Sequence, residues 1–90
     1  MTVKVKLCLF LVELTKCSKE NEVEGSTVGE CLENLIREIP KLKGEIIDPE
    51  GNLLYYLNIY VNGASTYPET LVRPVRDGDE IHIVLPLSGG

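Results

Sequence analysis

An amphipathic helix with clear signals at both ends is the feature that most constrains how this chain folds. Thr27 and Glu30 have the spacing of a capping box, in which their side chains accept hydrogen bonds from free backbone amides at the helix start. Pro40 predicts the end of the helix, because proline disfavours helical backbone at the preceding residue. Between these limits, apolar residues spaced by three and four form one stripe: Val28, Cys31, Leu32, Leu35, Ile36 and Ile39. Such a stripe is stable only when another element buries it.

The other periodic segments have the two-residue period of β-strands, which supplies a sheet for the helix to cover. Residues 2–12 alternate in this way and predict a first strand, and residues 57–61 and 81–85 predict two more. Residues 20–24 and 71–75 predict shorter strands at the periphery. Turn signals separate these segments at Asp48-Pro49-Glu50-Gly51, Asn62-Gly63 and Asp77-Gly78.

This order of elements predicts an α+β fold of the ubiquitin-like β-grasp type. One helix covers one face of a mixed sheet of four to five strands, and a right-handed crossover brings the first strand beside a later, parallel one. A chain of 90 residues has room for one hydrophobic core. We therefore expect a single domain over residues 1–90, globular over 1–85, with a mobile tail over 86–90.

The charge balance narrows the choice of partners. The net charge is −5, and the acidic residues are spread along the chain. Nucleic acids and anionic membranes bind through Lys and Arg, so neither is an expected partner, and a protein with a basic docking surface is favoured. The first residues have neither the pattern of a signal peptide nor the length of a membrane span.

The nucleophilic and metal-binding residue types do not form a recognisable site. Cys8, Cys17 and Cys31 are odd in number and lack the spacing of a zinc site, so a reducing, cytoplasmic setting fits best. His82 is the only histidine and has no marked nucleophile, so no catalytic dyad is predicted. We expect Cys31 in the core and Cys17 in an exposed loop, where a role in redox or sulfur relay stays open. No bound metal or cofactor is expected.

Three stretches, residues 23–32, 61–63 and 75–90, resemble the ubiquitin-like sulfur carriers. That family includes the small subunit of molybdopterin synthase and the sulfur carrier of the thiamine pathway. Its C-terminal glycine is adenylated by a ubiquitin-activating-type adenylyltransferase, which uses ATP and Mg, and sulfur then replaces one carboxylate oxygen. The resemblance places these roles on Gly90, with Gly89 beside it, and implies a co-substrate rather than an enzyme.

The composition of the last five residues suits entry into a narrow channel of a partner. Pro86 ends the pairing of the last strand, and Leu87 and Ser88 continue the segment that would thread the channel. Gly89 and Gly90 have no Cβ, so the backbone can pass close to the channel walls. Five extended residues reach at most about 17 Å, which is enough to cross such a channel.

The alternation of the strands also predicts a partner interface on the face of the sheet away from the helix. An uncovered apolar face normally marks an interface, and here it would receive the activating enzyme and the sulfur acceptor. As an alternative, residues 41–56 fold over this face. The expected interface residues are Cys8, Phe10, Tyr60, His82 and Val84, with Lys4 and Lys6 at the rim.

Several functions remain open within this resemblance. The ending Pro86-Leu87-Ser88-Gly89-Gly90 favours the small subunit of molybdopterin synthase, with a larger synthase subunit as partner, although Leu85 replaces the first of two prolines common in that subunit. Carriers for thiamine, cysteine or tungsten-type pterin synthesis stay open. A second reading is a ubiquitin-like modifier joined to lysines through Gly90, and a third is an interaction module without C-terminal chemistry. Fold alone does not decide among these functions.

Overall fold

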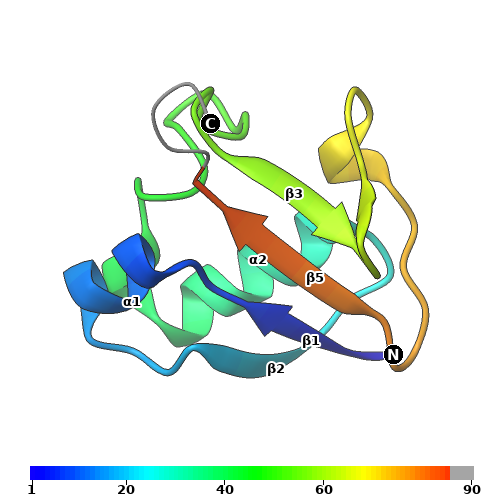
Figure 1. Cartoon of the computed structure of the whole chain (residues 1–90), viewed down its shortest axis with the longest axis horizontal. Helices are drawn as coiled ribbons and strands as arrows, with labels where there is room; N and C mark the ends of the chain where they lie inside the picture. Colours follow the sequence, from blue (N-terminus) through cyan, green and yellow to red (C-terminus); the bar gives the residue numbers. More distant parts are fainter. Residues whose placement is uncertain (86–90) are drawn as a thin grey trace.

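A computed structural model describes residues 1–85, and these form a ubiquitin-like β-grasp fold, which confirms the predicted class (Figure 1). The sheet has five strands in the order β2-β1-β5-β3-β4. The strands are β1 (Thr2–Lys6), β2 (Glu20–Glu24), β3 (Asn58–Val61), β4 (Ala64–Ser65) and β5 (Glu80–Val84). The helices are α1 (Leu9–Thr15) and α2 (Val28–Glu38), with 3-10 turns η1 (Pro40–Leu42) and η2 (Thr70–Val72).

The centre of the sheet is a parallel pair made by the first and last strands. β1 and β5 are in register at Lys6 and His82, whereas the other strand pairs are antiparallel. Parallel strands end at the same edge of a sheet. β1 and β5 therefore both end at the edge of the sheet where α1 lies (Figure 1).

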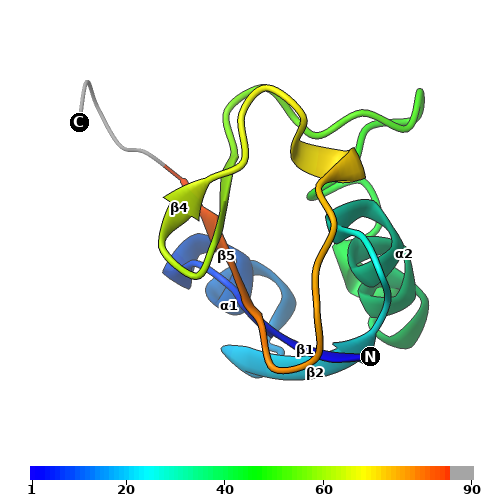
Figure 2. The same cartoon turned by 90° about the vertical axis from the view of Figure 1, so that its right-hand side faces the viewer.

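The core lies between α2 and one face of the sheet (Figure 2). Among residues 1–85, no helix is long and apolar enough to span a bilayer, and α2 has only 11 residues. From the helix, the apolar stripe contributes the buried residues Val28, Cys31, Leu32 and Leu35. From the sheet, the buried residues are Val3, Val5, Val23, Ile59, Val61, Ile81 and Ile83.

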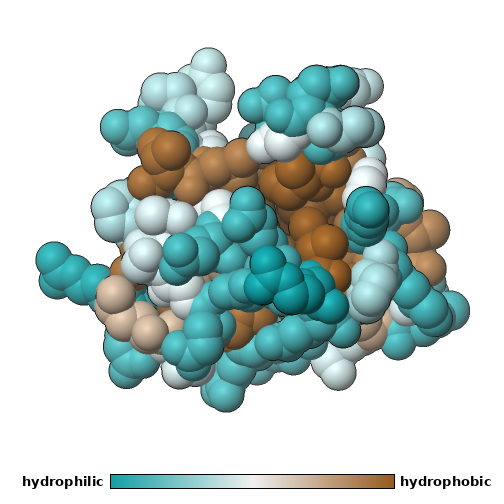
Figure 3. Space-filling view, turned by 180° about the vertical axis from the view of Figure 1, so that it is seen from behind, coloured by the Kyte–Doolittle hydropathy of each residue, from teal (hydrophilic) through white to brown (hydrophobic). Residues whose placement is uncertain are grey.

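Residues 41–56 lie on the α2 side of the sheet (Figures 1 and 2). Leu42 and Ile46 from this segment are fully buried in the core. Seen from the α2 side, hydrophobic side chains gather in a hollow between two projections at the upper edge (Figure 3). The alternative in which this segment covers the opposite face is therefore wrong.

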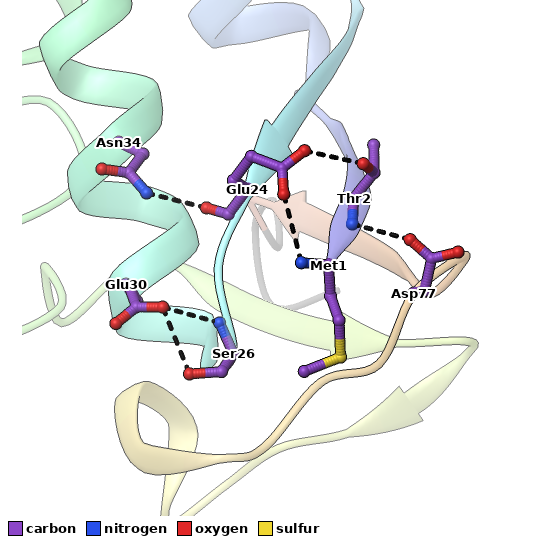
Figure 4. Close-up of polar contacts among 7 residues, drawn as sticks. All are labelled: Met1, Thr2, Glu24, Ser26, Glu30, Asn34 and Asp77. Carbon is purple, nitrogen blue, oxygen red and sulfur yellow. Dashed lines mark hydrogen bonds and ion pairs between the residues drawn. The ribbon is translucent and has the colours of Figure 1, made fainter.

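The predicted start of α2 is confirmed, with one of the two predicted capping hydrogen bonds in place. The amide of Glu30 donates to Thr27 Oγ1 at 3.1 Å, as the capping box requires. The Glu30 carboxylate accepts from the amide of Ser26 at 2.8 Å and from its hydroxyl at 3.2 Å, one residue earlier than predicted (Figure 4). The predicted end is also confirmed, since α2 stops at Glu38 and η1 begins at Pro40.

The prediction of one strand over residues 2–12 is wrong in its second half. β1 ends at Lys6, and residues 9–15 form α1. The apolar run after Lys6 fits both periods, because Leu11 and Thr15 are four residues apart and form the buried side of a helix. The Thr15 hydroxyl donates to the carbonyl of Leu11 at 2.7 Å, and Lys16 ends the helix with a φ of 57°.

The prediction of an edge strand over residues 71–75 is also wrong. The edge strand is β4, which follows the turn at Asn62 and Gly63, where φ is 51° and 85°. Residues 70–72 form η2 instead, in which the amides of Val72 and Arg73 donate to the carbonyls of Glu69 and Thr70 at 2.8 and 3.3 Å.

We expect Thr27→Ala to lower the free energy of unfolding by about 0.5–2 kcal/mol, because one amide at the start of α2 then loses its acceptor. Thr27→Ser keeps the hydroxyl and is the matched control. Urea unfolding followed by circular dichroism measures both variants. Equal stability of the alanine and serine variants would contradict a capping role for the hydroxyl.

Candidate functional site at the carboxyl ends of the central strands

The predicted chemical residues, Gly89 and Gly90, and the threading residues Pro86, Leu87 and Ser88 lie outside the residues that the structure describes. The structure does define where this segment begins. β5 pairs with β1 on one side and with β3 on the other, and its last residue, Val84, is in register with Asn58. A strand held on both sides gives the C-terminal segment a fixed origin.

One row of side chains crosses all five strands on the sheet face away from α2. The register pairs Glu20 with Lys6, and Lys6 with His82. It continues from His82 to Tyr60 and from Tyr60 to Ser65. Their neighbours along β1, β3 and β5 are buried under α2, and alternate strand residues point to opposite faces. This row therefore lies on the predicted interface face.

Ion pairs make this face more polar than the predicted aromatic and aliphatic patch. Lys6 Nζ lies 3.7 Å from a carboxylate oxygen of Glu20 and 3.4 Å from one of Glu80. His82 Nε2 lies 3.3 Å from the same oxygen of Glu80. The hydrogen bond with His82 and then that with Lys6 lower the pKa of Glu80. Such exposed pairs contribute little stability individually, but they fix the charge pattern that a partner meets.

The structure brings three of the five predicted interface residues to one depression. Cys8, His82 and Val84 line a hollow of about 370 Å³ together with Lys6, Leu9 and Lys19. This hollow lies at the edge where β1 and β5 end. A protein that holds the C-terminal segment at its origin would therefore contact it.

The other two predicted interface residues differ in position. Tyr60 lies on the face as predicted, next to His82 in the row, and is half-buried. Phe10 lies on α1, so its placement on a sheet strand is wrong. In the predicted long first strand, Leu9 would face the core. In the structure Leu9 begins α1 and is 72% exposed. The four-residue spacing of Leu11 and Thr15 was the signal for a helix.

Cys31 and Cys17 are buried and half-buried, respectively, among other side chains. Cys31 is fully buried, as predicted, and burial, followed by the Glu30 charge, raises the pKa of its thiol to about 11. Cys17 is half-buried, contrary to the expected exposure, and its sulfur lies 2.9 Å from Thr15 Oγ1. Within residues 1–85, no group of three histidine, cysteine or acidic side chains is placed to hold a metal ion.

A polar cluster anchors the opposite end of the central strands (Figure 4). Glu24 accepts from the Met1 amine at 3.1 Å and from the Thr2 hydroxyl at 2.7 Å, and Asp77 accepts from the Thr2 amide at 2.8 Å. The Thr2 hydroxyl, followed by the Met1 amine, lowers the pKa of Glu24. This cluster fixes the start of β1 beside the turn that precedes β5.

We expect His82→Ala to raise the pKa of Glu80 toward its usual value of 4.5, because it removes the hydrogen bond that is the largest cause of the lowered pKa. A lowered pKa in the folded state stabilises the protein above pH 4.5, and this contribution is lost as the pH falls through the lowered value. Carboxyl carbon NMR titration measures the shift. The lowered pKa of Asp79, caused first by Asn62, is the internal control and stays unchanged. A Glu80 pKa of 4.5 in both proteins would refute the contact.

Comparisons with known proteins place this chain among small carriers and modifiers. A family model described as "ThiS family" matches residues 5–90. The chain is 32% identical to the "Putative sulfur carrier protein" of Archaeoglobus fulgidus, with all of both chains covered. It is similar to SAMP1 from Haloferax volcanii, with a TM-score of 0.85, 28% identity and full coverage of both chains.

A further similar structure is the Amycolatopsis orientalis BexX/CysO complex, with a TM-score of 0.84 and 28% identity. The alignment covers 98% of this chain and 99% of that one. The family match and the relatives confirm the resemblance on which the site was predicted. The chain belongs to the ThiS family, a family of β-grasp sulfur carriers and ubiquitin-like modifiers.

Proposed function

We propose that this protein is a sulfur carrier whose C-terminal carboxylate, on Gly90, is converted to a thiocarboxylate. The observation that carries the proposal is the position of β5, which is paired on both sides and ends at Val84, shortly before a sequence that closes with two glycines. The partner enzyme must find one carboxylate among many. A fixed origin and a short reach of about 17 Å for five residues limit that search.

The chemistry requires a partner that binds ATP and Mg²⁺. The Gly90 carboxylate attacks the α-phosphorus, pyrophosphate leaves, and an acyl adenylate forms. The terminal sulfur of a partner persulfide then attacks the acyl carbon and AMP leaves, which gives an acyl disulfide. A second thiol cleaves the sulfur–sulfur bond by thiol–disulfide exchange and releases the thiocarboxylate. The carrier supplies the carboxylate, and the partner's cations stabilise the transferring phosphoryl group.

The docking surface that we propose for this partner is the hollow at the origin of the C-terminal segment, together with the row on the open face. Lys6 and Lys19 contribute ammonium groups, Glu20 a carboxylate and His82 an imidazole, and Leu9 and Val84 contribute apolar surface. Phe10 lies on α1 with 44% of its surface exposed and extends the apolar surface of that helix. A similar structure in which CysO is in complex with BexX supports a partner protein for this fold.

For the sulfur acceptor, we propose the larger subunit of molybdopterin synthase. The ending Pro86-Leu87-Ser88-Gly89-Gly90 supports this choice. Cysteine synthesis, which the sequence resemblance left open, is the alternative acceptor pathway. Incubation of the thiocarboxylated protein with each acceptor enzyme and its substrate separates the two, because only the true acceptor returns the carrier to its carboxylate form.

A second candidate function is conjugation to lysines of other proteins through Gly90. The likeness to SAMP1 from Haloferax volcanii, a small archaeal modifier protein, favours it. Both functions begin with the same acyl adenylate. They differ in the nucleophile that displaces AMP, which is a persulfide sulfur for the carrier and a lysine amine for the modifier.

Intact-mass measurement tests the carrier function directly. After incubation with an activating enzyme, ATP·Mg²⁺ and a persulfide donor, we expect a mass gain equal to replacement of one oxygen by sulfur. Deletion of Gly90 abolishes this gain, because Gly89 then presents a carboxylate one residue short of the reacting position. Glu33→Gln, at an exposed position on the outer side of α2, is the control and leaves the gain intact.

The same experiment has two outcomes against the proposal. ATP-dependent adducts to other proteins without any sulfur gain would establish the modifier function instead. A sulfur gain that survives deletion of Gly90 would refute the assigned residue.

The docking surface has its own test by NMR. On addition of the activating enzyme, we expect the amide signals of Cys8, His82 and Val84 to shift or broaden, because these residues surround the origin of the C-terminal segment. The amides of Glu33 and Arg37, on the outer side of α2, serve as controls and stay unchanged. Changes confined to α2 would contradict the proposed surface.

A further inference from the structure

A second surface is the groove between residues 52–59 and residues 65–71, which adjoins this site where Asn58 pairs with Val84. Its volume is about 420 Å³, and it opens on the side shown in Figure 3, where hydrophobic atoms fill the hollow between two projections. Leu53, Leu57 and Leu71 are among its apolar lining residues, and all three are buried or half-buried. The groove thus combines apolar and polar lining residues and opens to solvent.

Two tyrosines from different segments line this groove. Tyr55 is 95% exposed and Tyr67 is 83% exposed. Tyrosines of this kind are enriched at binding surfaces, because the ring contacts apolar groups while the hydroxyl stays hydrated. The faces of tyrosine rings also attract cations such as a guanidinium or ammonium group.

The charge of the groove indicates which kind of side chain can bind there. Glu69 is the only charged residue among its described lining residues, and none of them is Lys or Arg. Glu69 takes part in none of the ion pairs found within residues 1–85. An Arg or Lys side chain can lay its aliphatic stem on the apolar surface and bring its charged end to Glu69 and the tyrosines.

Both sides of the groove are held in place by hydrogen bonds. Thr66 is buried, and its hydroxyl donates to the Ile59 carbonyl at 2.8 Å, which ties residues 65–71 to β3. The amide of Leu54 donates to the Ile46 carbonyl at 2.9 Å, and the amide of Leu57 donates to the Leu54 carbonyl at 3.0 Å. A groove with fixed walls loses little conformational entropy when it binds a ligand.

We propose that this groove binds an arginine or lysine side chain presented by a surface segment of a partner protein. The net charge of −5 favours a basic partner and disfavours a second copy of this chain, which carries the same charge. The groove is lined by β3, β4 and the adjoining segments, whereas the hollow at the origin of the C-terminal segment is lined by the ends of β1 and β5. Glu69, Tyr55 and Tyr67 line the groove and do not line that hollow, so binding here does not require chemistry at Gly90.

The test uses the full chain labelled with nitrogen-15 and two blocked tripeptides, acetyl-Ala-Arg-Ala-amide and acetyl-Ala-Glu-Ala-amide. We expect the arginine peptide to shift the amide signals of residues 53–58 and 66–71 in a saturable manner. The glutamate peptide leaves these signals in place. The chain without Gly90 gives the same binding curve, which separates this result from the proposed sulfur chemistry.

Three variants locate the interaction. Glu69→Gln weakens binding of the arginine peptide about 2–5-fold, as expected for loss of an exposed ion pair. Tyr55→Ala weakens it by a similar factor through loss of the cation–π contact, about 2–5-fold at an exposed site. Glu22→Gln, at an exposed position on β2, removes the same charge far from the groove and leaves the affinity unchanged.

Three outcomes would overturn the proposal. Equal weakening by Glu22→Gln and Glu69→Gln would mean general attraction to an acidic protein. Peptide-induced shifts spread over α1 and β2, or no saturable shift at residues 53–58 and 66–71, would mean that the groove is not the site. Shifts of the groove signals with protein concentration alone would identify a second copy as the occupant.

Discussion

The parallel pairing of β1 with β5 is the interaction on which the rest of the structure depends. It joins the first residues of the chain to residues 80–84, so every other element must fit within the crossover between them. Backbone hydrogen bonds from Lys4 to the Asp79 carbonyl at 3.0 Å and from Gly78 to the Thr2 carbonyl at 2.9 Å extend this pairing at its start. The Thr2 amide adds a bond to Asp77. Because the two strands end at one edge, the same pairing sets where the C-terminal segment begins.

The crossover between β1 and β5 places buried apolar residues on one side of the sheet. α2 and residues 41–56 both lie on that side, and Leu42 and Ile46 complete the core there. A single helix leaves part of a five-stranded sheet uncovered, so this segment supplies the second part of the cover. On the opposite face, the side chains of the described residues form the row of charged and polar groups. The fold thus separates a stabilising face from a face available to partners.

Most of the fold follows from local sequence signals that are strong on their own. The capping residue Thr27, the breaker Pro40 and the turn at Asn62-Gly63 each restrict the backbone by a mechanism that tertiary contacts reinforce. Residues 7–12 are different, because an apolar run of this length fits a strand and a buried helix equally well. Packing of Leu11 and Thr15 decides in favour of α1, and packing is not visible in the run itself.

The candidate site was predictable to the extent that strand alternation determines it. Tyr60, His82 and Val84 lie on the predicted face because β3 and β5 are regular strands. Phe10 and Leu9 could not be placed, since their positions depend on α1. The ion pairs of Glu80 with Lys6 and His82 also require the register of three strands, which the alternation alone does not specify. The spacing of residues therefore predicts on which face of the sheet a side chain lies. The register of the strands decides which charged side chains come into contact.

The two surfaces of this protein differ in the chemistry that they offer. The hollow beside the origin of the C-terminal segment combines Lys6, Lys19 and His82 with Glu20 and apolar residues, and Lys6 is paired with Glu20. The groove beyond β3 presents Glu69 and two exposed tyrosines. A partner that matches the first surface contacts charges of both signs beside apolar residues, whereas a partner that matches the second presents a cation. One enzyme can engage both surfaces if it presents a basic side chain beside the surface that holds the C-terminal segment, and otherwise a separate partner occupies the groove.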